Sequence, residues 1–241
     1  LDALKTSVKP LDNYTILIDA GMPKQIFEML ELLISLNVKI QIVKRASMVL
    51  CKRLIYCTPL WLSLDNTTGL PNPQKEFFVD RYALDIVKDS IKSKLDNNII
   101  KPTRKVYLQR LNNKLRPITN LDLLEGMLDR IGFEFVDVGS LSFLEQFELF
   151  SESKIIIGVS GAAFTNILYM SSSAYAISLY PSAKSTNYYV FQPLADSSKV
   201  NLIHFLTKPK KGTNSVHAKA SVDIKRLEKK INELELNDKD N

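Results

Sequence analysis

The residues best suited to chemistry lie near the middle of the chain. Arg110 and Arg116 flank the polar loop LNNKL, directly after a β-prone run. Two guanidinium groups beyond the end of a strand can grip a diphosphate, because each offers paired N–H donors that match phosphate oxygens. The other interpretation of this pair is ordinary solvated charge in a loop.

A second feature is the stretch IIIGVSGAAFTN, in which a buried strand passes through Gly158, Val159, Ser160 and Gly161 into a helix. Small residues at such a joint allow a ligand to approach the backbone. The start of the helix offers N–H groups and partial positive charge to a phosphate or carboxylate. In open parallel sheets, ligands bind at the carboxyl ends of the strands, where this turn falls. Close packing of the strand against the helix is the alternative reason for small residues here.

Several other chemistries lack their motifs. The chain contains no Walker A, GxGxxG, HExxH or GxSxG sequence. No motif places a nucleophile or carboxylate near His204 or His217, so both are expected to be structural. Cys51 and Cys57 have no partner at metal-ligand spacing, and we expect free buried thiols in a strand-rich stretch. Neither a metal site nor a bound cofactor is expected.

The elements that position these residues follow from hydrophobic periodicity. We expect strands at 15–19, 38–43 and 54–56, helices at 24–36 and 78–95, and a long surface loop at 59–73. A Pro-containing hinge at Lys101 and Pro102 then divides the chain, because few contacts cross such links.

Beyond the hinge, strands and helices alternate regularly. Strands are expected at 106–108, 133–138, 155–159, 175–180 and 202–206, with helices at 120–131, 143–150, 162–170 and 221–236 and a basic loop at 208–212. This order predicts a parallel sheet covered by helices. The run from Ile155 to Ile157 does not alternate with polar residues, which is typical of a central strand buried on both faces.

Local signals support three of these helices. Ser142 with Glu145, and Thr119 with Asp122, have the spacing of capping boxes at helix starts. The last helix carries a narrow apolar stripe, which predicts docking against the same chain. The stripe consists of Ile224, Leu227, Ile231 and Leu234.

Composition narrows the function classes. The 241 residues are 45% hydrophobic and 24% charged, the balance of an ordinary globular protein. A net charge of +6 favours anionic partners, but no aromatic-basic motif accompanies it, so no nucleic-acid partner is expected. No apolar run approaches the roughly 20 residues that span a bilayer. We expect a cytoplasmic location, with peripheral contact to the inner face of the membrane as an open alternative.

Taken together, the run from YLQR to ILYM, continued by AYAISLYP, resembles the family 61 glycosyltransferases. The resemblance lies in the order of the landmarks. An Arg follows a strand, then come a second Arg, an Asn at a helix start, Gly-Phe, Leu-Ser-Phe-x-Glu-Gln, a buried strand, Gly-Ala-x-x-Thr-Asn and a strand ending Tyr-Pro. Here these are Arg110, Arg116, Asn120, Gly132 with Phe133, Leu141 to Gln146, Gly161 to Asn166, and Tyr180 with Pro181.

The resemblance implies an α/β protein of GT-B architecture, with two facing Rossmann-like domains and the C-terminal half the more complete. An acceptor-side domain would span 1–100, a donor-binding domain 101–210, and a basic loop and helix 211–241. The implied activity is inverting transfer of a sugar from a nucleotide-sugar donor to a polysaccharide or glycolipid acceptor in surface polysaccharide biosynthesis. The donor would contact Arg110, Arg116, Asn120, Gln146, Ser160, Gly161, Ala162, Thr165, Asn166 and Ser178; no catalytic base is assigned.

Two departures from the family pattern keep an alternative open. The family usually has His where this chain has Ser160, and an acidic residue where it has Ser178. A carboxylate at the second position could hold ribose hydroxyls more strongly than a serine. The alternative is therefore a non-catalytic or degenerate module of the same fold that binds sugar nucleotides. Gln146, in the same way, is either a ligand contact or a satisfied polar residue at a helix edge.

Overall fold

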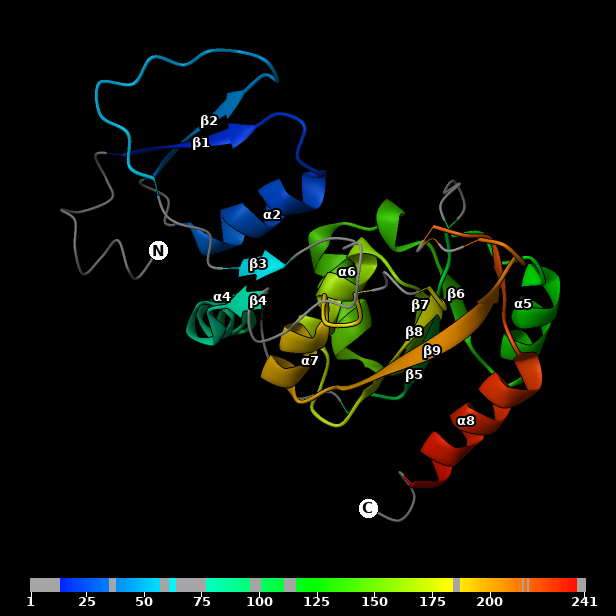
Figure 1. Cartoon of the computed structure of the whole chain (residues 1–241). Helices are drawn as coiled ribbons and strands as arrows, with labels where there is room; N and C mark the ends of the chain where they lie inside the picture. The colour runs from blue at the N-terminus through cyan, green and yellow to red at the C-terminus, as the bar shows by residue number, and fades with distance from the viewer. Residues whose placement is uncertain are drawn as a thin grey trace.

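The computed structural model describes residues 14–34, 38–56, 61–63, 77–95, 101–110, 116–183, 187–213, 215 and 217–237. It is a mixed α/β protein in which a parallel-rich sheet lies among helices, and a smaller N-terminal lobe projects to one side (Figure 1). Within the described residues, no helix is both long and apolar enough to cross a membrane.

The large sheet has the strand order β10-β9-β8-β7-β5-β6. All neighbouring strands from β6 to β9 are parallel, and β10 is antiparallel to β9. The predicted parallel sheet, with the Ile155 to Ile157 strand in its interior, is thereby confirmed. The strands are β5 (Arg104–Leu108), β6 (Glu134–Val136), β7 (Ser153–Val159), β8 (Tyr175–Pro181), β9 (Asn201–Pro209) and β10 (Ala220–Ser221).

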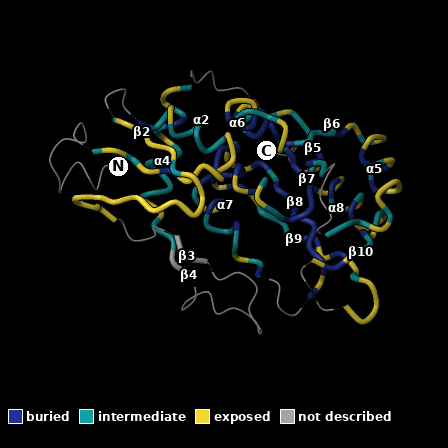
Figure 2. Tube along the Cα trace, turned by 90° about the horizontal axis from the view of Figure 1, so that it is seen from above, coloured by how far each residue is buried: buried dark blue, intermediate teal, exposed yellow. Residues whose placement is uncertain are grey.

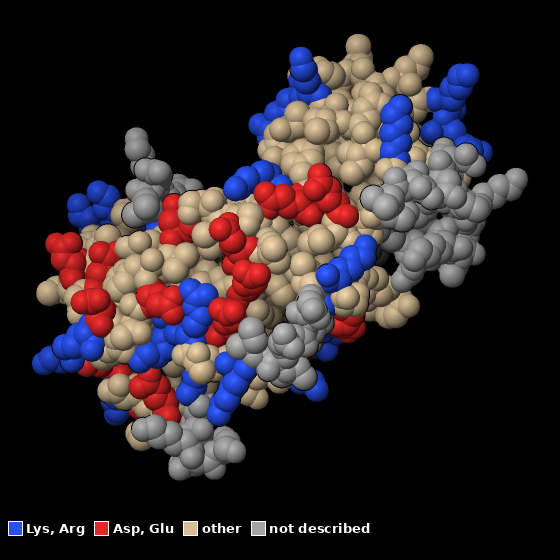
Figure 3. Space-filling view, turned by 180° about the vertical axis from the view of Figure 1, so that it is seen from behind, with Lys and Arg blue, Asp and Glu red and all other residues tan. Residues whose placement is uncertain are grey.

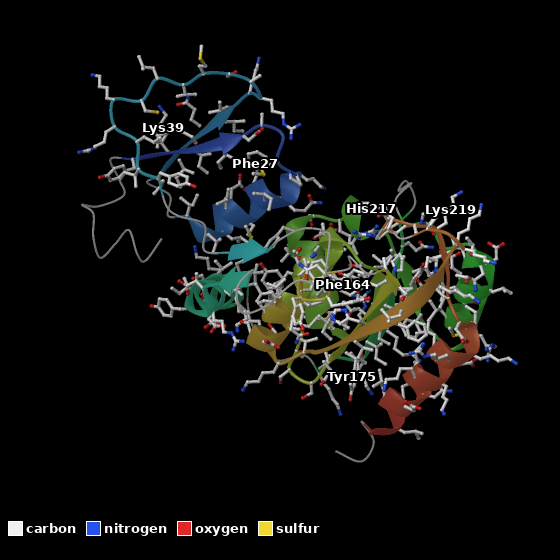
Figure 4. The ribbon with its side chains drawn as sticks, in the orientation of Figure 1. Phe27, Lys39, Phe164, Tyr175, His217 and Lys219 are labelled. Carbon is white, nitrogen blue, oxygen red and sulfur yellow. The ribbon has the colours of Figure 1, made fainter. Side chains whose placement is uncertain are left out.

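Helices cover both faces of this sheet. One face carries α6 (Phe143–Ser151), η3 (Ala162–Tyr169) and α7 (Gln192–Ser198), and the other carries α5 (Leu121–Arg130) and α8 (Ile224–Asn237). Ile156 of β7 belongs to the first core, whereas Ile155 and Ile157 belong to the second, and none of the three is exposed to solvent. Phe164 marks the middle of the first core (Figure 4). Buried residues accordingly gather around β5, β7 and β8 (Figure 2).

The N-terminal lobe is smaller. A parallel pair, β1 (Thr15–Asp19) and β2 (Lys39–Val43), is joined by α2 (Lys24–Leu33). An antiparallel pair, β3 (Trp61–Ser63) and β4 (Phe77–Val79), precedes α4 (Arg81–Lys94). Both helices pack on the first core, through Met29 of α2 and the buried Ile91 of α4. In the described residues this half forms two small sheets, so a second Rossmann-like domain, and the boundary at Lys101, stay predictions.

Local sequence signals explain several boundaries. Ser142 and Glu145 form the predicted capping box at the start of α6. The apolar stripe of α8 packs on the second core, as expected, and its Leu227 and Ile231 are fully buried. The predicted helix at 78–95 begins later, at Arg81, because the Asp80 side chain accepts a hydrogen bond from the Ala83 N–H at 3.1 Å and caps it there.

Other predictions were wrong. Residues 54–56 form no strand, because the β-prone side chains find no neighbouring strand and remain exposed. Cys51 is exposed rather than buried, and Cys57 lies outside the described residues. Of the expected loop at 59–73, only 61–63 are described, and they form β3. Helix α7 was not predicted from the sequence, and Lys208 belongs to β9 instead of a loop.

The proposed cap at Thr119 was also wrong. Its hydroxyl donates to the Ala220 carbonyl at 3.4 Å, and Asn120, the residue that precedes α5, provides no side-chain cap. The helix predicted after the GVSG turn is η3, a 3₁₀ helix whose hydrogen bonds span three residues instead of four. The first difference arises because Thr119 contacts Ala220, a residue distant in the sequence.

Candidate functional site

The candidate site lies where the strand order of the sheet reverses. From β5 the chain passes through α5 to β6 on one side, whereas from β7 it passes through η3 to β8 on the other. The loops that follow two such neighbouring strands leave in opposite directions and open a crevice, in which α/β proteins bind ligands. Arg110 follows β5 in this crevice, and Ser160 and Gly161 follow β7.

The two predicted arginines meet at one backbone oxygen. Arg110 donates from Nη2 to the Ser160 carbonyl at 3.0 Å, and Arg116 donates from Nη1 to the same oxygen. The Ser160 N–H is itself anchored to the Leu179 carbonyl of β8 at 3.1 Å. The loop charges are therefore positioned by the sheet and not dispersed into solvent.

The electrostatics of this pair favour an anion. Burial, and next the charge of Arg116, lower the pKa of Arg110. Among the described residues, no carboxylate contributes to that shift. Two like charges held together in a partly buried position repel each other, and a bound anion relieves both the repulsion and the desolvation. A guanidinium also has five N–H donors, and a single carbonyl oxygen cannot accept hydrogen bonds from all of them.

The glycines of the turn have different tasks. A Cβ added to Gly158 would lie 2.9 Å from the Cβ of Leu108, so this glycine serves close packing between strands. A Cβ added to Gly161 would lie only 1.6 Å from Nη2 of Arg110. Gly161 thus provides the space that the guanidinium occupies. Close packing of the strands thus explains Gly158, whereas the approach of a ligand to the backbone at this turn stays a prediction.

The backbone of Arg116 is unusual. Its φ of 57° lies in the left-handed region, which costs a residue with a side chain roughly 1–2 kcal/mol. Such conformations persist only where the surroundings impose them, and they cluster at functional sites. The strained backbone here directs the Arg116 side chain toward Ser160.

A pocket of about 300 Å³ opens beside the arginines, on the α5 side of the sheet. Three polar residues of its wall were not predicted from the sequence: Tyr107, Gln109 and Glu125. The available signal was position, since Gln109 directly precedes Arg110 and Glu125 follows Leu121 by one helical turn. The lining consists of Tyr107, Leu108, Gln109, Arg110, Arg116, Pro117, Ile118, Leu121, Glu125 and Val159.

Gln146 and Asn166 lie together in the interior, on the other face of the sheet. The Gln146 Nε2 donates to the Val138 carbonyl at 2.8 Å, and its Oε1 accepts from the Asn166 Nδ2 at 2.8 Å. Both side chains are buried. This network joins α6 to the middle of η3 and to the short helix η2 (Val138–Ser140).

Asn120 also binds the protein backbone. Its Nδ2 donates to the Val222 carbonyl at 2.8 Å, and its Oδ1 accepts from the Val222 N–H at 2.9 Å. This clamp, formed by Asn120 and Val222, ties the start of α5 to the segment between β10 and α8. Asn120 does not line the pocket beside the arginines.

The remaining predicted residues lie along η3 and β8. Ala162 and Thr165 are exposed near the start of η3, where the Thr165 hydroxyl donates to the Ala162 carbonyl at 2.6 Å. Ser178 is fully buried, and its Oγ has no hydrogen-bond partner among the described residues. It pairs in register with His204, whose Nδ1 likewise has none within those ranges. The ligand contacts predicted for these residues stay predictions.

No metal-binding arrangement is evident in the described part of the chain. Within these ranges, no three His, Cys, Asp or Glu side chains gather at a spacing that could hold a metal ion. The chemistry that the described residues do support is the binding of an anion at Arg110 and Arg116.

Comparison with protein families agrees with this geometry. A family model described as Glycosyltransferase 61 matches residues 22–177, which include both arginines, the Ser160 turn and the Gln146 network. The chain therefore belongs to glycosyltransferase family 61, and its general activity is that of a glycosyltransferase. No curated protein matches the chain.

Proposed function

We propose that the protein transfers a sugar, with inversion, from a nucleotide-sugar donor to a polysaccharide or glycolipid acceptor in surface polysaccharide biosynthesis. The observation that supports this proposal is the convergence of Arg110 and Arg116 on the Ser160 carbonyl, beside a pocket at the sheet reversal. A nucleotide sugar carries a diphosphate of the size and charge that such a pair can hold.

The proposed mechanism assigns the leaving group to these arginines. In an inverting transfer, the acceptor hydroxyl gives its proton to a general base and attacks the anomeric carbon from the face opposite the diphosphate, and the bond from that carbon to the diphosphate oxygen breaks in the same displacement. Negative charge develops on that oxygen as the bond breaks. Preorganised donors aimed at developing charge lower the barrier. Arg110 and Arg116 would supply the neutralisation, so the proposal requires no resident metal or cofactor.

The first test is a thermal-shift titration with UDP, GDP, CMP and their common sugar conjugates. A ligand present at 100 times its Kd stabilises the folded state by about 2.7 kcal/mol. We expect a shift with one nucleotide class and its loss in Arg110→Ala. If no nucleotide or nucleotide sugar binds at millimolar concentration, the proposal fails.

A matched pair of glycine variants sharpens this test. Gly161→Ala keeps both charges but places a methyl group where Nη2 of Arg110 lies, so it should reduce nucleotide binding while the fold persists. Gly126→Ala adds the same methyl group on α5, where nothing lies within 4 Å, and should leave binding unchanged. Equal binding by the two variants would show that the Arg110 position does not matter.

The alternative function is a sugar-nucleotide-binding module without catalysis, and Ser160 and Ser178 favour it. Donor binding by the wild-type protein without release of labelled sugar to any acceptor would support this alternative. Ser160→His with Ser178→Glu should then strengthen donor binding. The absence of any gain counts against the alternative.

We further propose that the acceptor is reached at the cytoplasmic face of a membrane, through the 44–56 segment. This exposed segment follows β2 and stands away from the large sheet (Figures 1 and 4). Met48 and Leu50 are completely exposed, which is unusual for large apolar side chains so close together. Lys44, Arg45, Lys52 and Arg53 flank them, and Lys and Arg side chains are spread over this lobe (Figure 3).

Apolar side chains that insert between lipids, combined with cations, suit an anionic bilayer surface. Leu50→Ser should lower sedimentation with vesicles that contain anionic phosphatidylserine, whereas Leu123→Ser, at an exposed position of α5, should not. Binding to neutral phosphatidylcholine vesicles should be weak in every case. Equal sedimentation of both variants with anionic vesicles would contradict this proposal.

A further inference from the structure

The pocket beside the arginines carries charges of both signs in its lining. Arg110 and Arg116 line it together with Glu125, whose carboxylate accepts a hydrogen bond from the Gln109 side chain. We infer that Glu125 and Gln109 form a hydroxyl-binding subsite, so that the pocket selects a phosphate ester carrying a hydroxyl-rich ring over a bare phosphate anion. This inference rests on the proposed function.

The geometry leaves the Glu125 carboxylate available to a ligand. Leu121 and Glu125 are four residues apart on α5, so both side chains face the pocket from the same side of the helix. The bond from the Gln109 Nε2 to the Glu125 Oε1 measures 3.4 Å, which is long and therefore weak. Among the described residues, Glu125 has no ion-pair partner.

The Tyr107 hydroxyl is affected by the charges of both Glu125 and Arg110. Burial raises the pKa of its hydroxyl to about 12; the charge of Glu125 adds to the increase, and the charge of Arg110 opposes it. The hydroxyl therefore stays protonated at neutral pH. Because both charges act on it, the Tyr107 hydroxyl lies in the electrostatic field of the arginine and of the carboxylate.

A carboxylate beside an anion site weakens the binding of the anion. Its negative charge repels any bound phosphate, with an energy that falls with distance. An ionised carboxylate can only accept hydrogen bonds. A ligand offsets the repulsion only if it brings donors to Glu125, which the hydroxyls of a ribose or of a sugar provide. Glu125 thus acts against inorganic phosphates and in favour of nucleotides or nucleotide sugars.

The test compares ligands that share the diphosphate and differ in hydroxyls. Calorimetric titrations would use inorganic pyrophosphate, the nucleoside diphosphate that binds the wild-type protein, its 2′-deoxy form and its sugar conjugate. In Glu125→Gln, the sugar conjugate should bind about tenfold more weakly, the effect of losing about 1.4 kcal/mol of charge-assisted hydrogen bonding. Pyrophosphate should bind more tightly to the same variant, because the repulsion is gone.

The two sources of hydroxyls give different outcomes. If Glu125 binds the ribose, the 2′-deoxy form should bind wild-type protein more weakly than the ribonucleotide, and Glu125→Gln should weaken it less than the ribonucleotide. If Glu125 binds the transferred sugar, Glu125→Gln should weaken the sugar conjugate alone, whereas the nucleoside diphosphate should behave like pyrophosphate. Either outcome supports the subsite.

Two control variants keep the inference open to refutation. Gln109→Ala should weaken nucleotide binding without tightening pyrophosphate, because an amide carries no charge. Glu148→Gln, at an exposed position of α6, should change neither. If Glu125→Gln shifts the sugar conjugate and pyrophosphate in the same direction, or shifts neither, the subsite is refuted while the proposed function stands. Wild-type protein that binds no nucleotide overturns both.

Discussion

Helices α2 and α5 have similar lengths and similar amphipathic patterns, but they lie in different surroundings. In α5, Leu124 and Leu128 are fully buried, because α8 and the sheet enclose them. In α2 no residue is buried, although Met29 packs against the first core. The comparison extends to the sheets, since β7 has neighbours on both sides and β1 pairs with β2 alone. An amphipathic pattern defines which face of an element is apolar, but the number of packed layers decides how deeply that face is buried.

The largest expected effect is a difference in the stability lost when two leucines are truncated. Leu128→Ala removes a fully buried side chain and should destabilise the protein by about 2–5 kcal/mol. Leu17→Ala, in β1, truncates a side chain that is 37% exposed and should cost less than about 1 kcal/mol. Urea unfolding measures both. Similar losses for the two variants would mean that the N-terminal lobe is as well packed as the large sheet.

The second effect concerns the clamp formed by Asn120 and Val222. Asn120→Ala leaves a partly buried backbone N–H and C=O without partners, which should cost about 1–3 kcal/mol. Asn201→Ala is the matched control, because its side chain donates to the Ser173 carbonyl at an exposed position. Denaturation midpoints should separate the two variants. A smaller loss for Asn120→Ala than for Asn201→Ala would contradict the clamp.

The third effect tests how α4 is held against α7. The Lys88 Nζ donates to the Asp85 Oδ1 at 2.8 Å and to the Ser197 carbonyl at 3.0 Å, and its side chain is only 14% exposed. Lys88→Ala should cost about 1 kcal/mol. The exposed pair between Arg81 and Asp196 bridges the same two helices, yet Arg81→Ala should cost no more than about 0.5 kcal/mol. Thermal unfolding at two salt concentrations measures both, and only the Arg81 contribution should fade with salt.

The smallest effect is a pH dependence from His204. Burial lowers the pKa of this imidazole in the folded state, so below the unfolded value of about 6.5 the unfolded chain binds more protons. The contribution of His204 to stability is complete above that pH and is lost as the pH falls. His204→Phe should therefore lose less stability than the wild-type protein between pH 7.5 and 5.5. An identical pH slope for the two proteins would remove His204 as the cause.

The sequence predicted the large sheet better than the N-terminal lobe for a physical reason. Ile155 to Ile157, and the capping box of Ser142 and Glu145, carry their information within a few residues. The 54–56 run has the same β-prone composition, but whether it forms a strand depends on a neighbouring strand that local sequence does not reveal. The fold was thus predictable where local pattern and tertiary contacts agree.

The candidate site was likewise predictable from the sequence only in part. The two arginines could be selected because strand ends in parallel sheets gather ligands. Their shared partner, the Ser160 carbonyl, lies 50 residues beyond Arg110 along the chain, and no motif marks a backbone oxygen. Asn120 matches the family pattern, yet its side chain binds Val222, 102 residues away. Glu125 was overlooked because the sequence does not show which residues of α5 face the pocket.

The hydrogen bonds from both guanidinium groups to the Ser160 carbonyl affect the side-chain entropy that is lost when a ligand binds. A flexible side chain that is ordered only when its ligand arrives costs roughly 0.5–1.5 kcal/mol of affinity. Here the Arg110 and Arg116 side chains are ordered during folding, by an oxygen fixed to β8. An arriving diphosphate meets donors that already point into the crevice, so the sheet, and not the ligand, has restricted their motion.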